Sequence, residues 1–206
     1  GRRFTYSEMD ERNSRLARAL RDEFGVTRGD RVAVLAENDT NFFETQFACW
    51  KLGAIFVPLN WRLSIPELEY IVGDAGPDVI IHDDQFADNA TKLAELCNIA
   101  HRITWGPSIG DAAAYEEVLT THDPLLDAED CTHDDVLTIM YTSGTTGRPK
   151  GAIITHGMTF WNAVNGVEYF DGGESMINLT FLPLFHTGGL NVFANPTFHF
   201  GGTNLV

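Results

Sequence analysis

The strongest limit on how this chain folds is its alternation of short β-branched runs with stretches of helical periodicity. Strand-like runs occur at residues 31–35, 55–57, 79–82 and 101–105, and helix-like stretches at about 5–24, 41–52, 64–75 and 87–97 precede or separate them. Helical crossovers between successive strands make the strands parallel and cover both faces of the sheet. The sequence therefore predicts an α/β fold, with a mostly parallel sheet and helices on both faces.

Several of the expected helix ends carry signals of their own. Thr5 followed by Glu8, and Ser64 followed by Glu67, have the spacing of capping boxes, which predict helix starts. Gly53 directly follows the stretch at residues 41–52, and glycine is the usual residue just beyond a helix C-terminus. These signals agree with the periodicity on where the helices begin and end.

The size and composition are those of a folded domain. The 206 residues are 44% hydrophobic and 21% charged, a composition far from that of disordered chains. The longest uninterrupted apolar run, residues 53–59, is much shorter than the roughly 20 residues that cross a bilayer. We therefore expect no transmembrane segment.

Charge and cysteine content bear on partners and compartment. The chain has 29 Asp and Glu against 14 Lys and Arg, a net charge of −15; this charge repels polyanions, so no nucleic-acid partner is expected. Cys49, Cys97 and Cys131 are odd in number and widely spaced, which fits reduced thiols and predicts a cytoplasmic protein. The histidines lack the spacing of metal ligands, so no metal site is predicted, and His82 is expected on the solvated surface.

A loop of unusual composition follows the apolar run at residues 136–140. Residues 141–151 read YTSGTTGRPKG, and the carboxyl end of a strand is where α/β sheets bind ligands. Hydroxyls, open glycine amides and a lysine are suited to hold the oxygens of a polyphosphate. The candidate phosphate-binding residues are Thr142, Ser143, Gly144, Thr145, Thr146, Gly147 and Lys150.

Two alternatives compete with this interpretation. A Walker loop would place the lysine directly after the second glycine and begin a helix there, whereas Arg148 and Pro149 intervene here and a β-branched run follows at 152–154. The other alternative is a Ser/Thr/Gly-rich turn of a β-hairpin, which requires neither four hydroxyls nor a lysine. The spacing disfavours the Walker loop, and the composition favours a phosphate loop over a plain turn.

Residues 141–156 resemble the phosphate-binding signature of the adenylate-forming superfamily, which includes acyl-CoA synthetases, luciferases and nonribosomal-peptide adenylation domains. Residues 50–60 (WKLGAIFVPLN) resemble an early helix-to-strand motif of that family, and residues 182–190 (LPLFHTGGL) resemble its substrate-site motif around a histidine. The resemblance covers essentially the whole chain and implies the N-terminal part of the family's large domain.

The resemblance also implies a role for one histidine. His186 stands at a predicted strand-to-helix turn, and the family implies that it is catalytic, where the acyl group meets the α-phosphate; a partly buried structural histidine is the alternative. Phe185, Phe193 and Phe198 are candidate walls of an acyl pocket or ordinary core residues. For His156 we expect a capping or packing role.

The reaction implied by the resemblance has two steps. A carboxylic acid, fatty-acyl or related, reacts with ATP to give acyl-AMP and pyrophosphate, and coenzyme A then displaces AMP to form a thioester. ATP, Mg²⁺ and coenzyme A are the substrates and cofactors expected of such a ligase. An adenylation domain for an aryl or amino acid, and a non-catalytic phosphate- or acyl-binding module, are the alternatives.

We expect the chain to be incomplete relative to that family. Residues 1–135 are predicted to be an α/β part and residues 136–206 the phosphate loop and substrate-site segment, whereas the family's adenine, ribose and magnesium motifs and its small C-terminal domain have no match in this sequence. We therefore expect the 206-residue chain alone to be inactive. Only Glu168, Asp171 and Glu174 are charged after residue 150, so we also expect this segment to expose apolar surface and drive self-association.

Overall fold

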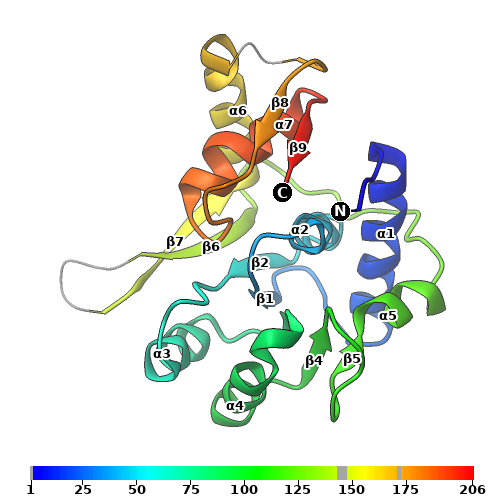
Figure 1. The fold of residues 1–206 in the computed structure, drawn as a ribbon, viewed down its shortest axis with the longest axis vertical. Coiled ribbons are helices and arrows are strands. Elements are labelled where there is room, and N and C mark those ends of the chain that lie inside the picture. The colour runs from blue at the N-terminus through cyan, green and yellow to red at the C-terminus, as the bar shows by residue number, and fades with distance from the viewer. Residues whose placement is uncertain (1, 143–147, 171–172) are drawn as a thin grey trace.

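A seven-stranded sheet with helices on both faces organises the described part of the chain, residues 2–142, 148–170 and 173–206 of a computed structural model (Figure 1). Its strands are β1 (Arg31–Leu35), β2 (Ile55–Pro58), β3 (Val79–His82), β4 (His101–Thr104), β5 (Ala113–Ala114), β6 (Val136–Thr142) and β7 (Lys150–Thr155). Their order is β5-β4-β3-β1-β2-β6-β7, and neighbouring strands are parallel except for the antiparallel pair β6 and β7.

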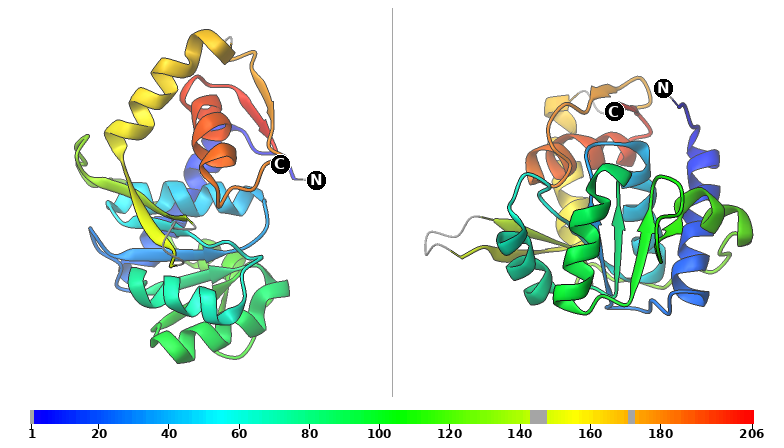
Figure 2. Two further views of the ribbon diagram at one scale, coloured as in Figure 1. Left: turned by 90° about the vertical axis from the view of Figure 1, so that its left-hand side faces the viewer. Right: turned by 60° about the horizontal axis from the view of Figure 1, so that its bottom comes forward.

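Helices cover both faces of the main sheet (Figure 2), and alternate residues of its central strand β1 belong to different cores. Val32 and Val34 belong to a core shared with α1 (Tyr6–Asp22), α2 (Thr40–Leu52) and α5 (Tyr115–Thr121). Ala33 and Leu35 belong to a second core, shared with α3 (Ile65–Ala75) and α4 (Ala87–Cys97), which the 3₁₀ turn η1 (Asp84–Phe86) precedes. Strand side chains alternate between the two faces of a sheet, so the single strand β1 contributes side chains to both cores.

The predicted fold class, a mostly parallel α/β sheet covered on both faces, is confirmed. The predicted strands and helices agree with the observed ones to within about three residues, and the capping box of Thr5 and Glu8 is present, with Glu8 N–H donating to Thr5 Oγ1 at 3.2 Å. Gly53 has a φ of +63° at the end of α2, as a left-handed C-cap requires.

One expectation about the histidines is wrong. His82 is fully buried at the end of β3, where its Nδ1 lies 2.9 Å from the carbonyl oxygen of Asp83. Burial lowers the pKa of His82, because the charged imidazolium loses its hydration. The run 79–82 is buried along its whole length, so its last position belongs to the core although it carries a polar residue.

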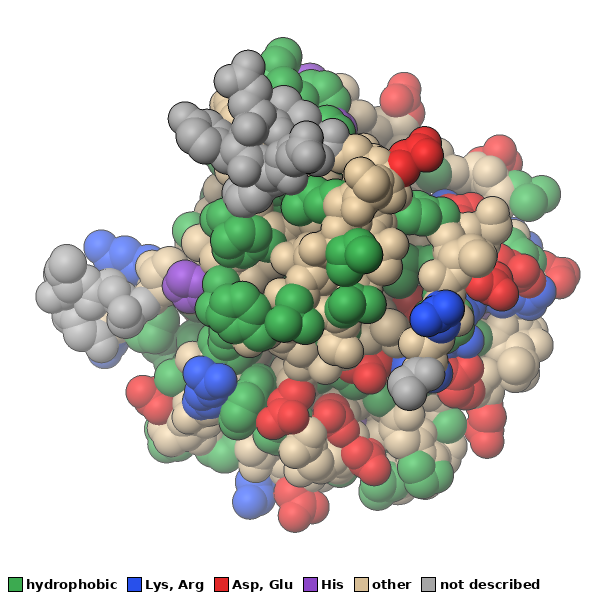
Figure 3. All heavy atoms as spheres, turned by 45° about the horizontal axis from the view of Figure 1, so that its top comes forward, with side chains coloured by type: hydrophobic (Ala, Val, Ile, Leu, Met, Phe, Trp, Pro, Cys, Tyr) green, Lys and Arg blue, Asp and Glu red, His purple; other side chains and the backbone are tan. Residues whose placement is uncertain are grey.

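Residues beyond β7 form a layer above the main sheet. It consists of α6 (His156–Phe170), a two-stranded parallel sheet of β8 (Ile177–Leu179) and β9 (Thr203–Leu205), the π-helical η2 (Gly188–Ala194) and α7 (Asn195–His199). Several large apolar side chains of this layer are exposed, and Figure 3 shows hydrophobic side chains gathered on one face. They include Met158, Trp161, Ile177, Leu179, Phe181, Leu205 and Val206. The expectation that the segment exposes apolar surface is confirmed.

No described helix is long and apolar enough to span a bilayer.

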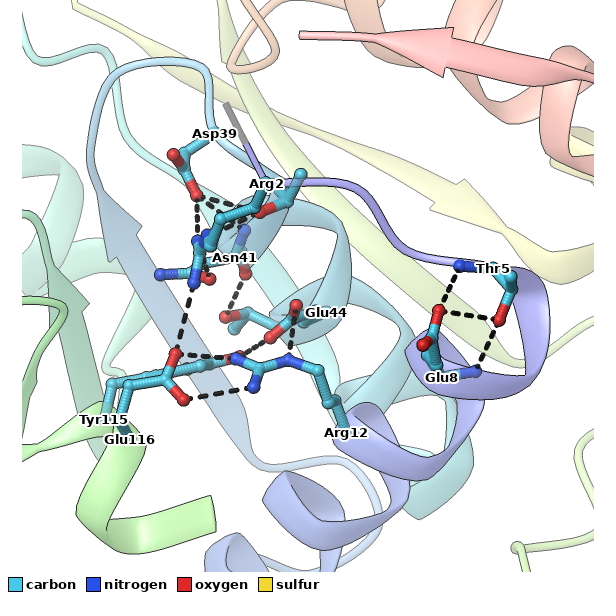
Figure 4. A network of polar contacts seen from close by, with 11 residues as sticks. Arg2, Thr5, Glu8, Arg12, Asp39, Asn41, Glu44, Tyr115 and Glu116 are labelled. Carbon is cyan, nitrogen blue, oxygen red and sulfur yellow. Dashed lines mark hydrogen bonds and ion pairs between the residues drawn. The ribbon is translucent and has the colours of Figure 1, made fainter. Parts of the chain in front are cut away.

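A polar network centred on one buried carboxylate joins three helices of one layer (Figure 4). Glu44 on α2 is fully buried; it accepts from Arg12 Nε of α1 at 2.9 Å and from the Tyr115 hydroxyl of α5 at 2.9 Å. Arg12 also reaches Glu116 at 2.7 Å, and this contact lowers the pKa of Glu116. Arg2 adds contacts to Glu116 at 3.2 Å and to Asp39, just before α2, at 2.8 Å.

Because Glu44 has no access to water, we expect Arg12→Ala to lower the free energy of unfolding by about 3 kcal/mol, the cost of leaving a buried carboxylate without its charged partner. Arg18→Ala, which removes a half-exposed pair with Asp22 on the same helix, should cost less than about 1 kcal/mol. Urea unfolding followed by circular dichroism measures both. Equal midpoints for the two variants would contradict the assignment of Arg12 to a buried network.

Candidate functional site

A β-hairpin carries the predicted phosphate loop at one edge of the sheet. β6 runs parallel to β2, with Thr138 beside Phe56, so the carboxyl end of β6 at Thr142 lies on the same side of the sheet as the carboxyl ends of the other parallel strands. Thr142 and Lys150 face each other in the last pair of the hairpin, and directly opposed residues project their side chains to the same face. Both side chains are exposed. The other five predicted binding residues, Ser143, Gly144, Thr145, Thr146 and Gly147, lie outside the described residues.

Helix α3 contacts both sides of this hairpin. The Tyr141 hydroxyl of β6 donates to Asp74 Oδ2 at 2.7 Å, and the Arg148 guanidinium lies 5.6 Å from the centre of the Tyr70 ring. Tyr70 and Asp74 are one helical turn apart and so share a face of α3. Partial burial and the Asp74 carboxylate raise the pKa of Tyr141, because both disfavour the phenolate.

The ring of Tyr141 leaves no room for a side chain on the opposite strand. Gly151 pairs with Tyr141, and a Cβ on this glycine would lie 2.8 Å from Ile139 Cγ2 and 3.2 Å from Tyr141 Cζ. Real Cβ contacts are rarely this close, so glycine at this position lets the two strands pair with the tyrosine in place. The glycine that ends the sequence motif therefore has a packing reason.

The predicted catalytic histidine lies in the turn before η2. Its Nδ1 accepts a hydrogen bond from the Gly188 amide at 3.1 Å, which in the neutral imidazole leaves the proton on Nε2. The side chain is exposed, so His186 presents an N–H donor to its surroundings. Gly189 is required for the turn, since a Cβ there would lie 2.4 Å from the carbonyl oxygen of Pro183. The π-helical geometry that follows is itself common at functional sites.

The hairpin and the histidine turn line one cavity of about 400 Å³. The structure thus brings Thr142 and His186 together, 44 positions apart in the sequence. Of the predicted site residues, Lys150 is not part of this lining, although it opposes Thr142 in the hairpin. The complete lining is Pro58, Leu59, Asn60, Leu63, Glu67, Ile71, Tyr141, Thr142, Arg148, Pro149, Phe185 and His186.

The candidate acyl-pocket residues have different surroundings. Phe185 lines the cavity beside His186, whereas the ring of Phe198 packs edge-on against Phe43 at 4.9 Å and Phe47 at 5.1 Å in the main core. Phe198 therefore packs against the main core, and it does not line the cavity that contains His186. His156 packs its ring 6.2 Å from that of Trp50, as its expected packing role requires.

Three cations lie in or near the segments that line this cavity. Arg62, Arg148 and Lys150 form no ion pair within 4.0 Å among the described residues. The guanidinium of Arg62 instead lies over the Trp61 ring at 4.9 Å and the Phe185 ring at 5.8 Å. Unpaired cations at one edge of a strongly acidic protein favour an anionic ligand. Sequence reasoning missed Arg62; its place two residues beyond the second motif, at the end of β2, is the signal that could have identified it.

Comparison with known proteins agrees with this geometry. The sequence matches the family described as AMP-binding enzyme over residues 1–206. A feruloyl-CoA synthase of an Amycolatopsis species is 42% identical over 206 residues, covering 100% of this chain and 39% of that protein. The long-chain-fatty-acid–CoA ligase FadD13 of Mycobacterium tuberculosis H37Rv is 34% identical over 193 residues, covering 91% of this chain and 37% of that protein. The chain thus spans about two fifths of the length of these relatives.

Solved structures show the same fold. ATP-bound MatB from Rhodopseudomonas palustris superposes with a TM-score of 0.88 at 29% identity, covering 100% of this chain and 40% of that one. The anthranilate CoA ligase AuaEII, in complex with anthranoyl-AMP, gives a TM-score of 0.93 at 26% identity, covering 100% of this chain and 40% of that one.

We predict that Lys150→Ala in the complete enzyme weakens binding of pyrophosphate or ATP by roughly 30- to 150-fold, about 2 to 3 kcal/mol, because a charge-assisted contact is lost. Isothermal titration calorimetry with pyrophosphate measures the change. Lys92→Ala is the control: it removes an exposed lysine from α4, which connects β3 and β4, and β1 and β2 separate these strands from the hairpin. It should leave the affinity for pyrophosphate unchanged. Equal affinities for the two variants would favour a plain hairpin turn over a phosphate loop.

Proposed function

Because this chain belongs to the AMP-binding enzyme family, we propose that it forms the N-terminal part of the nucleotide-binding domain of a carboxylate–CoA ligase. In the proposed division, residues 1–135 supply the α/β scaffold and residues 136–206 supply the phosphate hairpin and the substrate-site segment. The observation that carries the proposal is the single cavity shared by Thr142 and Arg148 of the hairpin and by His186.

The proposed reaction joins a carboxylate to the α-phosphate of ATP and releases pyrophosphate; coenzyme A then displaces AMP to give a thioester. A carboxylic acid with an ordinary pKa near 4 is already ionised at pH 7, so the attacking group needs no general base. The site needs cations and hydrogen-bond donors for the negative charge that develops on the phosphates. The hairpin with Arg148 and Lys150 supplies the cations, and the Nε2–H of His186 supplies a donor in the same cavity as Arg148.

The proposed Mg²⁺ accompanies ATP in this reaction class and neutralises part of the phosphate charge. The described residues contain no group of three acidic, histidine or cysteine side chains that could hold a metal ion. They do not fit a metal site of their own, so no proposed step depends on one.

We propose an aromatic acid as the substrate. The relative named feruloyl-CoA synthase is 42% identical, against 34% for the relative named as a long-chain-fatty-acid ligase. The adenylate in the superposed AuaEII complex is also an aromatic one, anthranoyl-AMP. The sequence led us to expect a fatty-acyl or related substrate, and this is the alternative. A pyrophosphate-exchange assay distinguishes an aromatic acid from a fatty acid as the substrate.

A cytoplasmic location is proposed on the same grounds, because ATP and coenzyme A are the substrates and the three cysteines are free. Self-association of the isolated chain is proposed through the apolar layer beyond β7, since an exposed patch of that kind favours contact between copies.

Acid-dependent exchange of labelled pyrophosphate into ATP tests the proposed function. In the complete ligase that would contain this segment, ferulate should support exchange and palmitate should support less. The isolated 206-residue chain should support none, because loss of the remaining substrate contacts removes the effective molarity of the reactants. Saturable ATP binding without exchange by any acid would favour a non-catalytic binding module.

We predict that His186→Ala in the complete ligase lowers the rate of adenylate formation by about 100-fold, since a donor beside the reacting carboxylate is removed. The KM for ATP should change by less than about threefold, because the proposed contact of His186 is with the reacting carboxylate and not with the phosphates. His199→Ala, on α7 and outside this cavity, is the matched control. A His186 variant that unfolds earlier but keeps the full rate would assign His186 a structural role.

A further inference from the structure

The side-chain amide of Asn38 makes three hydrogen bonds to the backbone just before the turn that carries His186. From this contact we infer that Asn38 is a positioning residue for His186, an inference that rests on the proposed function of His186. Asn38 is not part of the cavity lining, so it acts on the site through the backbone that it holds.

Asn38 uses both ends of its amide. Its Nδ2 donates to the carbonyl oxygens of Thr180 at 3.2 Å and Leu182 at 2.8 Å, and its Oδ1 accepts from the Leu184 N–H at 2.9 Å. These three backbone groups alternate along residues 180–184, so the side chain pairs with the segment as a neighbouring strand would. The opposite orientation of the amide would place its oxygen against two carbonyl oxygens, so the network fixes one orientation.

The segment held by Asn38 is the base of the histidine turn. The His186 N–H donates to the Pro183 carbonyl oxygen at 3.1 Å, and the His186 carbonyl oxygen accepts from the Gly189 and Leu190 amides at 3.1 Å. Gly189 lies so close to the carbonyl of Leu182 that a Cβ would come within 2.7 Å of its oxygen. A shift of Leu182 therefore moves both the turn and the first residues of η2.

Asn38 is itself fixed on the side of the main sheet. It follows β1, the central strand, by three residues and precedes Asp39, whose carboxylate accepts from the Asn41 N–H at 3.0 Å and begins α2. Arg2 pairs with Asp39 at 2.8 Å (Figure 4). Asn38 thus hydrogen-bonds the loop between β1 and α2 to the segment before the histidine turn, which also contributes Leu184 and Leu190 to the main core.

Two substitutions separate the two ends of the amide. Asn38→Asp keeps the acceptor for the Leu184 N–H and replaces the donor with an oxygen that faces two carbonyl oxygens. Asn38→Ala removes all three contacts. Asn178→Ala is the control, since Asn178 is also partly buried and makes two hydrogen bonds, but to the side chains of Thr180 and Asn204.

Amide hydrogen exchange tests the contact without reference to activity. We expect the Leu184 amide to exchange roughly 5- to 10-fold faster in Asn38→Ala than in the parent protein, the change expected for loss of one hydrogen bond. It should be slower in Asn38→Asp than in Asn38→Ala, and unchanged in Asn178→Ala. Unchanged Leu184 exchange in a folded Asn38→Ala protein would overturn the inference.

The position of His186 is tested by two further readouts. In the complete ligase, Asn38→Asp should lower kcat for adenylate formation by roughly 10- to 100-fold, with the KM for ATP changed by less than about threefold. Lowering the pH should recover part of the rate relative to the parent, because the carboxyl group that Asn38→Asp introduces regains one donor when it is protonated. An unchanged kcat would overturn the inference even if Leu184 exchange were altered.

The NMR chemical shift of the His186 Cε1 proton provides the readout that does not depend on turnover. It should move in both Asn38 variants and stay constant in Asn178→Ala. If the parent ligase shows no exchange of pyrophosphate into ATP with any carboxylic acid, the proposed function fails. The chemical shift of His186 still decides whether Asn38 positions the ring. A His186 resonance identical in parent and Asn38→Ala proteins would overturn the inference on its own.

Discussion

The parallel register of β1, β2 and β6 is the constraint on which the rest of this structure depends. Parallel strands end at the same edge of a sheet, so whatever follows them in sequence is brought together in space. Asn38 follows β1, Arg62 follows β2 and Thr142 ends β6. The phosphate hairpin, the unpaired arginine and the support of the histidine turn therefore gather at one edge although more than 100 positions separate the first from the last.

The charge distribution gives this edge its chemical character. The whole chain carries a net charge of −15 and would repel a nucleotide, yet most of its arginines form ion pairs with carboxylates, five of them at Arg2 or along α1. Arg62, Arg148 and Lys150 have no such partner among the described residues. Cations without a carboxylate partner retain their field; of the three, Arg148 lines the cavity, Lys150 opposes Thr142 of the lining in the hairpin, and Arg62 lies over the ring of Phe185, another lining residue.

Much of the fold could be predicted from sequence because its signals are local. Capping boxes, glycine stops and β-branched runs depend on residues within a few positions of one another, and they locate the first four strands and helices. The short α5 and the strands β5 and β8 were missed, since they have two to seven residues and little periodicity to detect. The site was located in part: His186 and Thr142 share a cavity as their motifs suggested, but Asn38 acts on residues more than 140 positions away. Nothing in the local sequence of Asn38 distinguishes such a contact from an ordinary helix-start asparagine.

The hairpin also shows why backbone geometry alone does not separate a phosphate loop from a plain turn. β6 and β7 pair up to Thr142 and Lys150, so the connection between them closes a hairpin whichever function it has. What a turn does not require is the support on α3, where Asp74 holds the hydroxyl of Tyr141 and Tyr70 lies under Arg148. A plain turn also does not require a cavity that it shares with a histidine. Nδ1 of His186 already accepts a hydrogen bond from the Gly188 amide, so only Nε2 is available to a ligand. A hairpin held on one side by α3 and facing an oriented donor on the other has the features of a site that grips an anion and orients the group that reacts with it.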